Sequence, residues 1–438
     1  MEPKKSPAWL VLRQVRAVDP SRGLDDTVDV LIEAGRVVRI GRNACAGLES
    51  LAGARVIDAA GKWLLPGFVE VHAHFREPGF EYKEDIESGL KASAAGGYAH
   101  VCAMPNTRPA NDSPSVTRHM IERAHALGGP RLYPIAAVTQ GLKGEVLTDM
   151  AALKAAGAVA FSDDGRCVTS SELMRRALQA ACALDVAVIQ HAEDHAATAT
   201  AQMHEGDVSR RLGIPGWPRQ AEDSIVARDL ELVRATRGRY HVAHASTRGT
   251  VELVRRAKQQ GLPVSAEAAP HHLLLTDASI DGTDARYKVN PPLREEDDVQ
   301  ALREGLADGT IECVATDHAP HSAEEKLLPM AKAPPGMVGI EFCLPLMIGL
   351  VEEGVLSLAR LVDALTAAPA RLIGIEAPAL REGVTANLCL FDPAPRYALD
   401  ERSLHSKSTN TPFAGRPLTG RVQMCLAQGA IAYEYDGK

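Results

Sequence analysis

The alternation of short apolar runs with longer amphipathic ones is the strongest pattern in the chain, and it extends from about residue 67 to 375. Such alternation is typical of strands and helices in repeating βα units. The candidate strands lie at 67–75, 98–106, 131–138, 158–165, 186–194, 240–246, 263–270 and 311–320. Eight strands over about 300 residues suit a (β/α)8 barrel, so the sequence predicts an α/β fold of the TIM type.

The stretch KEDIESGLKASAAGG at 83–97 predicts one of the intervening helices. Ile86, Leu90 and Ala94 recur every four residues, which places them on one face of a helix. The pair Gly96-Gly97 follows directly and is expected to end it.

The two ends of the chain differ, because short β segments replace the βα alternation. They occur in AWLVLRQVRAV, TVDVLIEAGRVVRIG and RVIDAAGKWLLPG near the start and in NLCLFDPAPRY and GRVQMCLAQGAIAYEY near the end. We therefore predict two domains: a small composite β-sandwich built from residues 1–66 and 376–438, and a barrel from residues 67–375.

Composition and charge narrow the class of protein. Hydrophobic residues make up 45% of the 438 residues and charged residues 24%, as in soluble globular proteins. The net charge of −8 offers no basic surface for nucleic acid, and no apolar run reaches the roughly 20 residues of a membrane span. The apolar run near the N-terminus is too short for a signal peptide, and the eight cysteines contain no CxxC pair. We expect a cytoplasmic protein with reduced, buried thiols and with neither nucleic acid nor a membrane as partner.

His72 and His74, in the stretch EVHAHFREPG, are the first candidates for chemistry. Alternate side chains of a strand share a face, so the two imidazoles are directed to one point. Further ligand-type residues lie near the C-terminal ends of other predicted strands, where the active sites of this fold are found; they are Asp163, Asp164, His191, His244 and Asp317. Imidazole and carboxylate ligands suit zinc or a similar divalent ion, and their number favours two ions.

Other histidines compete for these roles, namely His195, His241, His271, His272 and His318. In an unbroken strand His241 and His244 face opposite sides, and His244 is nearer the strand end. We therefore favour His244 as a ligand and place His241 in the core or against a helix. The pattern alone leaves Asp163 and Asp164 as alternatives.

Four motifs make the chain similar to the dihydroorotase family of the amidohydrolase superfamily. They are PGFVEVHAHFREPG at 66–79, MPNTRP at 104–109, FSDDG at 161–165 and VNPPLREEDDVQALREGLADGTIECVATDHAPHSAEEK at 289–326. The spacing of the ligand-type residues resembles the single-domain, class I bacterial type, and the likeness covers essentially the whole chain.

The resemblance implies a ligand set for one or two zinc ions. His72, His74 and Asp317 would hold one ion, and His191 and His244 would hold the second. Asp164, in preference to Asp163, would bridge them. Many superfamily members use a carboxylated lysine as the bridge, but the run AVAFSDDG has no lysine.

The resemblance also implies how substrate is bound. Arg76, Asn106 and His321 would bind the exocyclic carboxylate, for which the planar guanidinium is well matched. Asn290 and the backbone of Pro335-Gly336 would hydrogen-bond the pyrimidine ring, and His74 completes the substrate-binding set. The alternative for Arg76 is a surface ion pair with Glu77 or Glu81.

Two departures from the family pattern are Glu70, where an aspartate is usual, and Asn387 near the tail. Glu70 shares a face with His72 on a regular strand, so it concerns the surroundings of the metal. Asn387 concerns the sheet domain.

The function implied is reversible cyclisation of N-carbamoyl-L-aspartate to L-dihydroorotate in pyrimidine (UMP) biosynthesis, with Asp317 as the catalytic acid and base. The alternatives are another cyclic amidohydrolase, such as an allantoinase or a dihydropyrimidinase (hydantoinase), and a non-catalytic partner of aspartate transcarbamoylase. The resemblance leaves open a homodimer and an association with aspartate transcarbamoylase.

Overall fold

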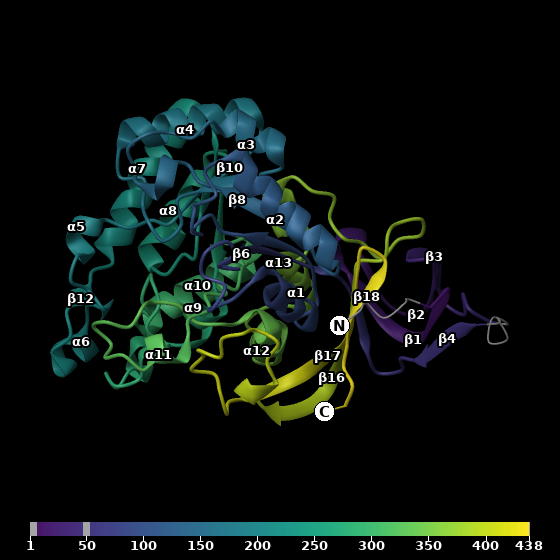
Figure 1. Ribbon diagram of the computed structural model, residues 1–438. Helices are drawn as coiled ribbons and strands as arrows, with labels where there is room; N and C mark the ends of the chain where they lie inside the picture. The colour runs from purple at the N-terminus through teal and green to yellow at the C-terminus, as the bar shows by residue number, and fades with distance from the viewer. Residues whose placement is uncertain (1–6, 47–52, 438) are drawn as a thin grey trace.

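The computed structural model describes residues 7–46 and 53–437, so parts of the predicted domain at 1–66 and 376–438 lie outside the described residues. Eight parallel strands form the larger part of the molecule (Figure 1). They are β6 (Phe68–Ala73), β7 (Tyr98–Ala103), β8 (Arg131–Ala136), β9 (Ala160–Ser162), β10 (Ala187–Gln190), β13 (Arg239–Val242), β14 (Val264–Ala268) and β15 (Cys313–Val314). Seven lie within the predicted runs, and β13 begins one residue before its run. A parallel bridge between Ala73 and His318 links the first strand to the segment after the last.

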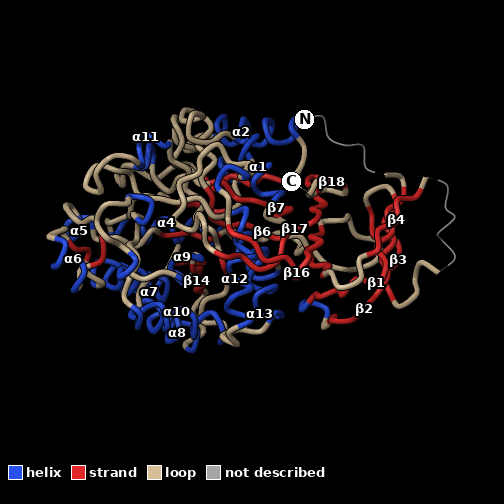
Figure 2. The backbone as a smooth tube through the Cα atoms, turned by 90° about the horizontal axis from the view of Figure 1, so that it is seen from below, coloured by secondary structure: helices blue, strands red, loops and turns tan. Residues whose placement is uncertain are grey.

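Helices surround these strands, as the blue segments around the red ones show in Figure 2. The longer helices are α1 (Ile86–Ala95), α2 (Pro114–Leu127), α3 (Met150–Ala156), α4 (Ser171–Leu184), α7 (Gln220–Thr236), α8 (Arg248–Gln259), α10 (Glu296–Asp308), α12 (Cys343–Glu352), α13 (Leu358–Leu365) and α14 (Ala367–Ile373). Shorter elements are α5 (His195–Thr198), α6 (Asp207–Leu212), α9 (Pro270–Leu274), α11 (Ala323–Lys326) and the paired strands β11 (Met203–His204) and β12 (Gly216–Trp217). The predicted helix α1 begins after the N-cap Asp85 and ends at Gly96.

Strand alternation divides the barrel core into two layers. Ala187 and Ile189 of β10 face the barrel interior with Val69, whereas Val188 packs outward with Phe161 against the helices. The parallel strands are therefore buried on both faces, which explains their continuous apolar sequences.

The ends of the chain build one eight-stranded sheet, seen to the right in Figure 1. Its strands are β1 (Trp9–Asp19), β2 (Leu24–Glu33), β3 (Arg36–Gly41), β4 (Ala54–Asp58), β5 (Trp63–Pro66), β16 (Leu388–Ala398), β17 (Pro417–Ala427) and β18 (Ala430–Glu434). The two halves join where β5 pairs antiparallel with β16. This composite sheet beside the barrel confirms the predicted fold class.

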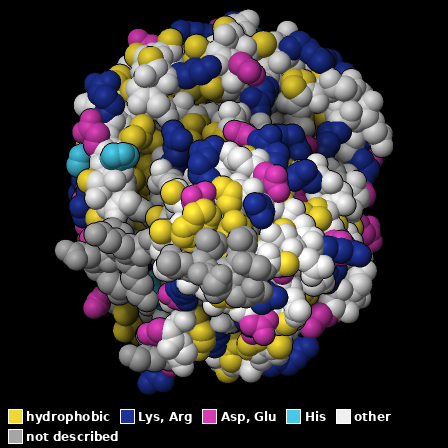
Figure 3. Space-filling view, turned by 90° about the vertical axis from the view of Figure 1, so that its right-hand side faces the viewer, with side chains coloured by type: hydrophobic (Ala, Val, Ile, Leu, Met, Phe, Trp, Pro, Cys, Tyr) yellow, Lys and Arg dark blue, Asp and Glu magenta, His cyan; other side chains and the backbone are white. Residues whose placement is uncertain are grey.

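The two faces of the composite sheet have different neighbours. Leu64 and Leu390 contribute to a core of the sheet itself, whereas Leu65 and Phe391 belong to the same core as the barrel and its helices. The departure at Asn387 lies in this region, where its Oδ1 accepts the backbone N–H of Gln428 at 2.7 Å. On the face shown in Figure 3, basic and acidic side chains are interspersed.

No helix of the described residues is long and apolar enough to cross a membrane. The eight cysteines form no disulfide within the part of the chain that the structure describes, and all except Cys182 are buried.

Candidate active site

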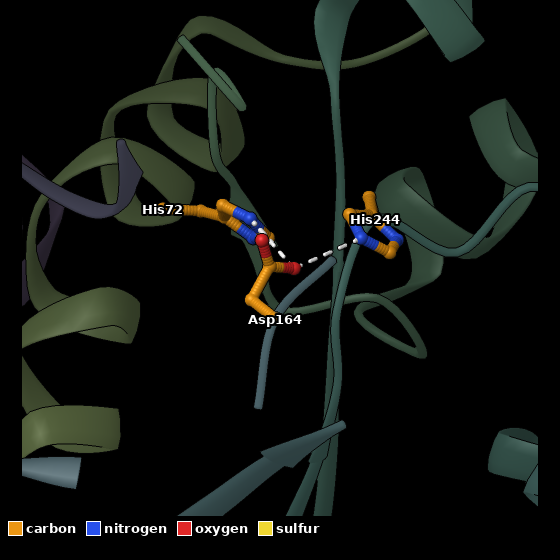
Figure 4. A group of neighbouring side chains, drawn as sticks. All are labelled: His72, Asp164 and His244. Atoms are coloured by element: carbon orange, nitrogen blue, oxygen red, sulfur yellow. Dashed lines mark ion pairs between the residues drawn. The ribbon is translucent and has the colours of Figure 1, made fainter. Parts of the chain in front are cut away.

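The six predicted metal ligands converge near the C-terminal ends of the barrel strands. Three imidazoles surround one carboxylate oxygen, Oδ1 of Asp164: Nε2 of His72 at 3.3 Å, Nε2 of His244 at 3.5 Å and Nδ1 of His191 at 3.6 Å. Figure 4 shows His72 and His244 on different sides of this carboxylate. Nε2 of His74 lies 3.5 Å from the other oxygen, Oδ2.

Asp317 completes the cluster. Its Oδ1 lies 3.2 Å from Nε2 of His74 and 3.5 Å from Nε2 of His72. Two overlapping groups of ligand atoms therefore exist, one around His72, Asp164 and His244 and one around His72, His74 and Asp317.

The two aspartates of FSDDG point to different places. Asp163 accepts hydrogen bonds from the backbone N–H of Thr139, at 2.9 Å, and from the Thr139 hydroxyl. Asp164, one residue later, faces the imidazoles instead. The structure thus brings Asp164 into the cluster and turns Asp163 toward the segment after β8.

Several site residues lie beyond the regular strands. β13 ends at Val242, and His244 has a φ of 31°. β6 ends at Ala73, and Arg76 has a φ of 59°; Asp317, after β15, has a φ of 47°. Left-handed backbone is uncommon for such residues and is concentrated at functional sites. Because the strand has ended before Arg76, strand alternation does not determine the direction of this side chain.

His241 lies within β13, before the strand ends, and has different partners from His244. Its side chain is fully buried and hydrogen-bonded to Ser265 Oγ at 2.7 Å and to Glu267 Oε2 at 3.0 Å. The same carboxylate, through Oε1, contacts Nδ1 of His72 at 2.5 Å. His241 thus lies behind the cluster rather than against a helix, while His244 enters the cluster directly.

The cluster fits a divalent cation. Nε2 of His72 and Oδ1 of Asp164 are buried and have no hydrogen-bond partner among the described residues. Burying such atoms unpaired is costly, so their convergence indicates a missing ligand. Six nitrogen and oxygen donors of this kind are suited to zinc or a similar ion.

Hydrogen bonds on the far sides of the rings direct lone pairs into the cluster. Nδ1 of His74 contacts Asn106 Oδ1 at 2.9 Å, and Nε2 of His191 contacts Glu193 Oε2 at 2.9 Å. An acceptor at these nitrogens places the ring proton there and leaves the other nitrogen free to bind metal. Glu267 does the same for His72.

The charges of the cluster are coupled. Burial opposes ionisation of Asp164 and Asp317, but the neighbouring imidazoles, His72 first, hold the pKa of both carboxyls below the usual range. Burial likewise opposes protonation of His191, yet Asp164 and Glu193 raise its pKa to about 10. The carboxylates are therefore ionised and ready to bind a cation.

Glu70, the departure from the family pattern, is fully buried, and burial raises its pKa to about 8. Its carboxyl group accepts the backbone N–H groups of His72, at 2.8 Å, and Thr316, at 3.0 Å. The Glu70 carboxyl group therefore connects β6 with the segment after β15 through backbone N–H groups. These hydrogen bonds do not involve the imidazoles of the cluster.

The remaining competing histidines lie outside both groups of ligand atoms. His195 contacts Glu193, His272 contacts the Pro291 carbonyl, and His318 contacts Glu84. His271 is buried beside His272, with ring centroids 4.3 Å apart.

The predicted carboxylate-binding residues lie next to the cluster. Arg76 Nε donates to the Pro320 carbonyl at 3.3 Å, and its Nη2 lies 3.4 Å from His321 Nε2. Burial lowers the pKa of Arg76 to about 10, which leaves it charged at neutral pH. Arg76 forms no ion pair with any described carboxylate, so the surface-pair alternative with Glu77 or Glu81 is wrong.

His321 is held on both sides of its ring. Nε2 contacts the Pro335 carbonyl at 2.8 Å, and Lys83 Nζ lies 3.3 Å from Nδ1. Burial, followed by the nearby cations, strongly lowers the pKa of His321, so the ring is neutral. Because the lysine donates to Nδ1, the ring proton is on Nε2.

The other predicted substrate-binding residues differ in whether they already have partners within the protein. Asn106 contacts His74 through Oδ1, so its position depends on a predicted metal ligand. Gly336 has a φ of 134°, and a Cβ there would come within 2.7 Å of Ala319 Cβ. The Asn290 side chain has no hydrogen-bond partner in the described part of the chain and is half-buried.

Sequence reasoning missed the residues that support the site, notably Glu267, Glu193, Lys83 and Asn410. Glu267 could have been suspected, because it is a charged residue inside the apolar run of a predicted strand. The others lie in loops, where a polar residue is ordinary.

A third group of ligand-type side chains, His204, Asp277 and Glu295, lies apart from this cluster. Arg294 donates to Nδ1 of His204 at 3.1 Å, so the neutral ring carries its proton on Nε2 and offers a cation no lone pair there. Arg219 already pairs with Glu295 at 2.7 Å. These residues form an ion-pair network.

The chain is similar to proteins of known family. A family model described as "Dihydro-orotase-like" matches residues 61–250. The dihydroorotase of Anaeromyxobacter dehalogenans (strain 2CP-C) is 48% identical over 425 residues, covering 97% of each chain. That of Geobacter metallireducens is 45% identical over 425 residues, covering 97% of this chain and 99% of the relative.

Solved structures of similar fold include the L-hydantoinase (dihydropyrimidinase) from Arthrobacter aurescens, with a TM-score of 0.86 and 25% identity over 97% of this chain and 96% of that one. The D-hydantoinase from Thermus sp. gives a TM-score of 0.81 at 25% identity, over 98% and 96% of the two chains. The sequence identity is much higher to the dihydroorotases and extends over nearly their whole length, and on that ground this chain belongs to the dihydroorotase family.

Proposed function

We propose that the protein is a zinc-dependent dihydroorotase of the class I type, which interconverts N-carbamoyl-L-aspartate and L-dihydroorotate. The observation that carries the substrate assignment is Arg76, a half-buried guanidinium beside the ligand cluster with no carboxylate partner among the described residues. A partly buried cation without an anionic partner favours an anionic ligand. Dihydroorotate carries a carboxylate on its ring, whereas dihydrouracil and hydantoin carry none.

The metal would be held by His72, His74, Asp164, His191, His244 and Asp317. When bound, zinc polarises a carbonyl and makes water a better nucleophile at neutral pH. Asp164 is the proposed bridge because imidazoles lie beside both of its oxygens: His72 beside Oδ1 and His74 beside Oδ2.

The chain's own residues would then bind and transfer protons. Arg76, His321 and Asn106 hold the substrate carboxylate, and Asn290 with the backbone at Pro335 and Gly336 holds the ring. In ring opening, Asp317 accepts a proton from the attacking water and passes it to the departing ring nitrogen as the C–N bond breaks. Ring closure, the biosynthetic direction, is the reverse.

Replacing Asp317 tests this role. Asp317→Asn keeps the size of the side chain but removes its basicity, so kcat should fall by about 1000-fold or more, since general acid–base catalysis contributes up to about 10⁴-fold. Metal content is measured alongside. A kcat near that of the wild type would contradict the assignment.

A substrate panel tests the function as a whole. The purified, zinc-loaded protein is assayed with L-dihydroorotate, allantoin, dihydrouracil and hydantoin. We expect the highest kcat/KM with L-dihydroorotate. Faster turnover of dihydrouracil or allantoin would favour the cyclic amidohydrolases that resemble the chain in fold.

Metal content separates an enzyme from a scaffold. A non-catalytic partner of aspartate transcarbamoylase should bind little zinc after reconstitution, whereas we expect one or two ions per chain. Self-association, association with aspartate transcarbamoylase and a cytoplasmic location stay predictions of the resemblance. Light scattering of the protein, alone and mixed with aspartate transcarbamoylase, tests the first two.

A further inference from the structure

We propose that Asn410 is a positioning residue that holds together the two chain segments at the substrate pocket. The inference rests on the proposed function, because it acts through His321, Pro335 and Gly336. Asn410 lies in the connection between β16 and β17, a part of the chain otherwise associated with the composite sheet.

The side-chain amide of Asn410 joins the two segments directly. Its Oδ1 accepts the backbone N–H of His321 at 3.0 Å. Its Nδ2 donates to the carbonyls of Ala319 and Gly336, each at 3.1 Å. Its own carbonyl accepts the N–H of Val338 at 3.1 Å. One buried residue, 5% exposed, therefore connects the segment after Asp317 with the segment that contains Pro335.

The connection is itself anchored to the barrel. Ser408 Oγ donates to the Lys83 carbonyl at 2.7 Å, and Lys407 N donates to Glu84 at 3.2 Å. On the other side, Phe413 contacts Phe342 at a ring-centroid distance of 6.1 Å. The yellow segment between β16 and β17 in Figure 1 follows this course beside α12. These contacts on both sides fix the position of Asn410 and therefore of its side-chain amide.

The chemistry of the contact requires an amide. One oxygen accepts and one nitrogen donates twice, which no other side chain of this size can do. An aspartate would place a carboxylate against two carbonyl oxygens and lose both donors. The segments also approach closely at Gly336 and Ala319, so a small change in their spacing would move the groups that face the substrate.

The expected effect is on substrate binding more than on the metal. Asn410 contacts none of the six proposed ligands in the described residues, whereas it contacts the backbone of His321 and Gly336 directly. Disturbing it should shift the carboxylate-binding and ring-binding groups relative to one another. KM should therefore rise more than kcat falls.

The test is Asn410→Asp in the full-length, zinc-loaded enzyme, with Asn387→Asp as the matched control. Asn387 directly precedes β16, and its Oδ1 also accepts a backbone N–H, but the donor is Gln428, which belongs to neither pocket segment. We expect KM for L-dihydroorotate to rise about tenfold or more in Asn410→Asp, as for loss of a buried hydrogen bond, with zinc content unchanged. Asn387→Asp should keep the wild-type KM.

A wild-type KM in a folded Asn410→Asp variant would overturn the inference alone. If that variant does not fold, Asn410→Ser, which is too short to bridge the segments, replaces it, and an unchanged KM again overturns the inference. Wild-type enzyme that fails to turn over L-dihydroorotate would instead overturn the proposed function and this inference together.

Discussion

Single hydrogen bonds on the outer sides of the histidine rings decide which nitrogens can bind metal. Nδ1 of His72 faces Glu267, Nδ1 of His74 faces Asn106 and Nε2 of His191 faces Glu193. In each case the opposite nitrogen is directed toward Asp164 or Asp317. This preorganisation raises ligand basicity and fixes ring orientation before the ion binds.

Glu267→Gln should weaken metal binding by about 10- to 100-fold, because the ring of His72 loses its anionic partner. Affinity is measured by competition with a chromophoric chelator. Glu252→Gln, on the outer side of α8 where the side chain is 43% exposed, is the control and should bind as the wild type does. Unchanged affinity in Glu267→Gln would show that the contact is structural only.

The neighbouring aspartates of FSDDG offer a matched pair. Asp164→Asn should reduce zinc content below that of the wild type, because the carboxylate shared by four imidazoles is lost. Asp163→Asn should keep the zinc, since Asp163 bonds Thr139 instead. Elemental analysis measures the zinc content of both variants. Loss of zinc in Asp163→Asn but not in Asp164→Asn would make Asp163 the bridge.

At the scale of elements, all eight barrel strands were predictable, but their ends were not. The run 311–320 contains only a two-residue strand, Cys313–Val314, and Asp317 follows with left-handed backbone. Asp317 reaches the cluster from beyond the end of β15, so the predicted run continues past the last residue of the strand. The short strands β11 and β12 were missed because two residues show no period.

The segment between β15 and α12 contains a buried lysine, Lys326, which donates to the Pro334 carbonyl at 2.9 Å. Burial, and then Lys288, lowers its pKa from 10.5 to about 7. At a pH between these two pKa values, Lys326 is protonated in the unfolded chain and neutral in the folded one. Lys326 therefore makes the free energy of unfolding increase with pH from about 7 to 10.

Lys326→Met should therefore flatten the pH dependence of unfolding relative to the wild type. Urea denaturation at pH 7, 8 and 9 measures the free energy of unfolding of the two proteins. The difference between them at each pH cancels the contributions of the other titrating groups. Lys332→Met, an exposed change in the same segment, should leave the slope unaltered. A slope in Lys326→Met equal to that of the wild type would contradict the lowered pKa.

At the scale of the whole molecule, the barrel and the composite sheet share a core. Phe391 of β16 is fully buried in the same cluster as the barrel residues, and its ring centroid lies 5.7 Å from that of Trp63. Asn410, from the next connection, extends the contact to His321 in the proposed substrate pocket. The precise boundaries predicted at residues 66 and 376 stay a prediction.

Phe391→Ala should lower the free energy of unfolding by about 3–5 kcal/mol, as for other large buried side chains. Because the core is shared, tryptophan fluorescence and activity should be lost in one urea transition. Val56→Ala, at a site 42% exposed, should have little effect. Two separate transitions would mean that the sheet and the barrel unfold independently.

The sequence by itself determined the fold class, the order of the strands along the chain and which histidines and aspartates are candidate ligands, because these follow from local periodicity and from motifs such as HAHFREPG and TDHAPHSAEEK. Only the tertiary structure decided which aspartate faces the imidazoles and that Glu267, Glu193 and Asn410 support the site. The physical reason is distance along the chain. Glu267 is 195 residues from His72, and Asn410 is 89 residues from His321, so no local pattern connects them.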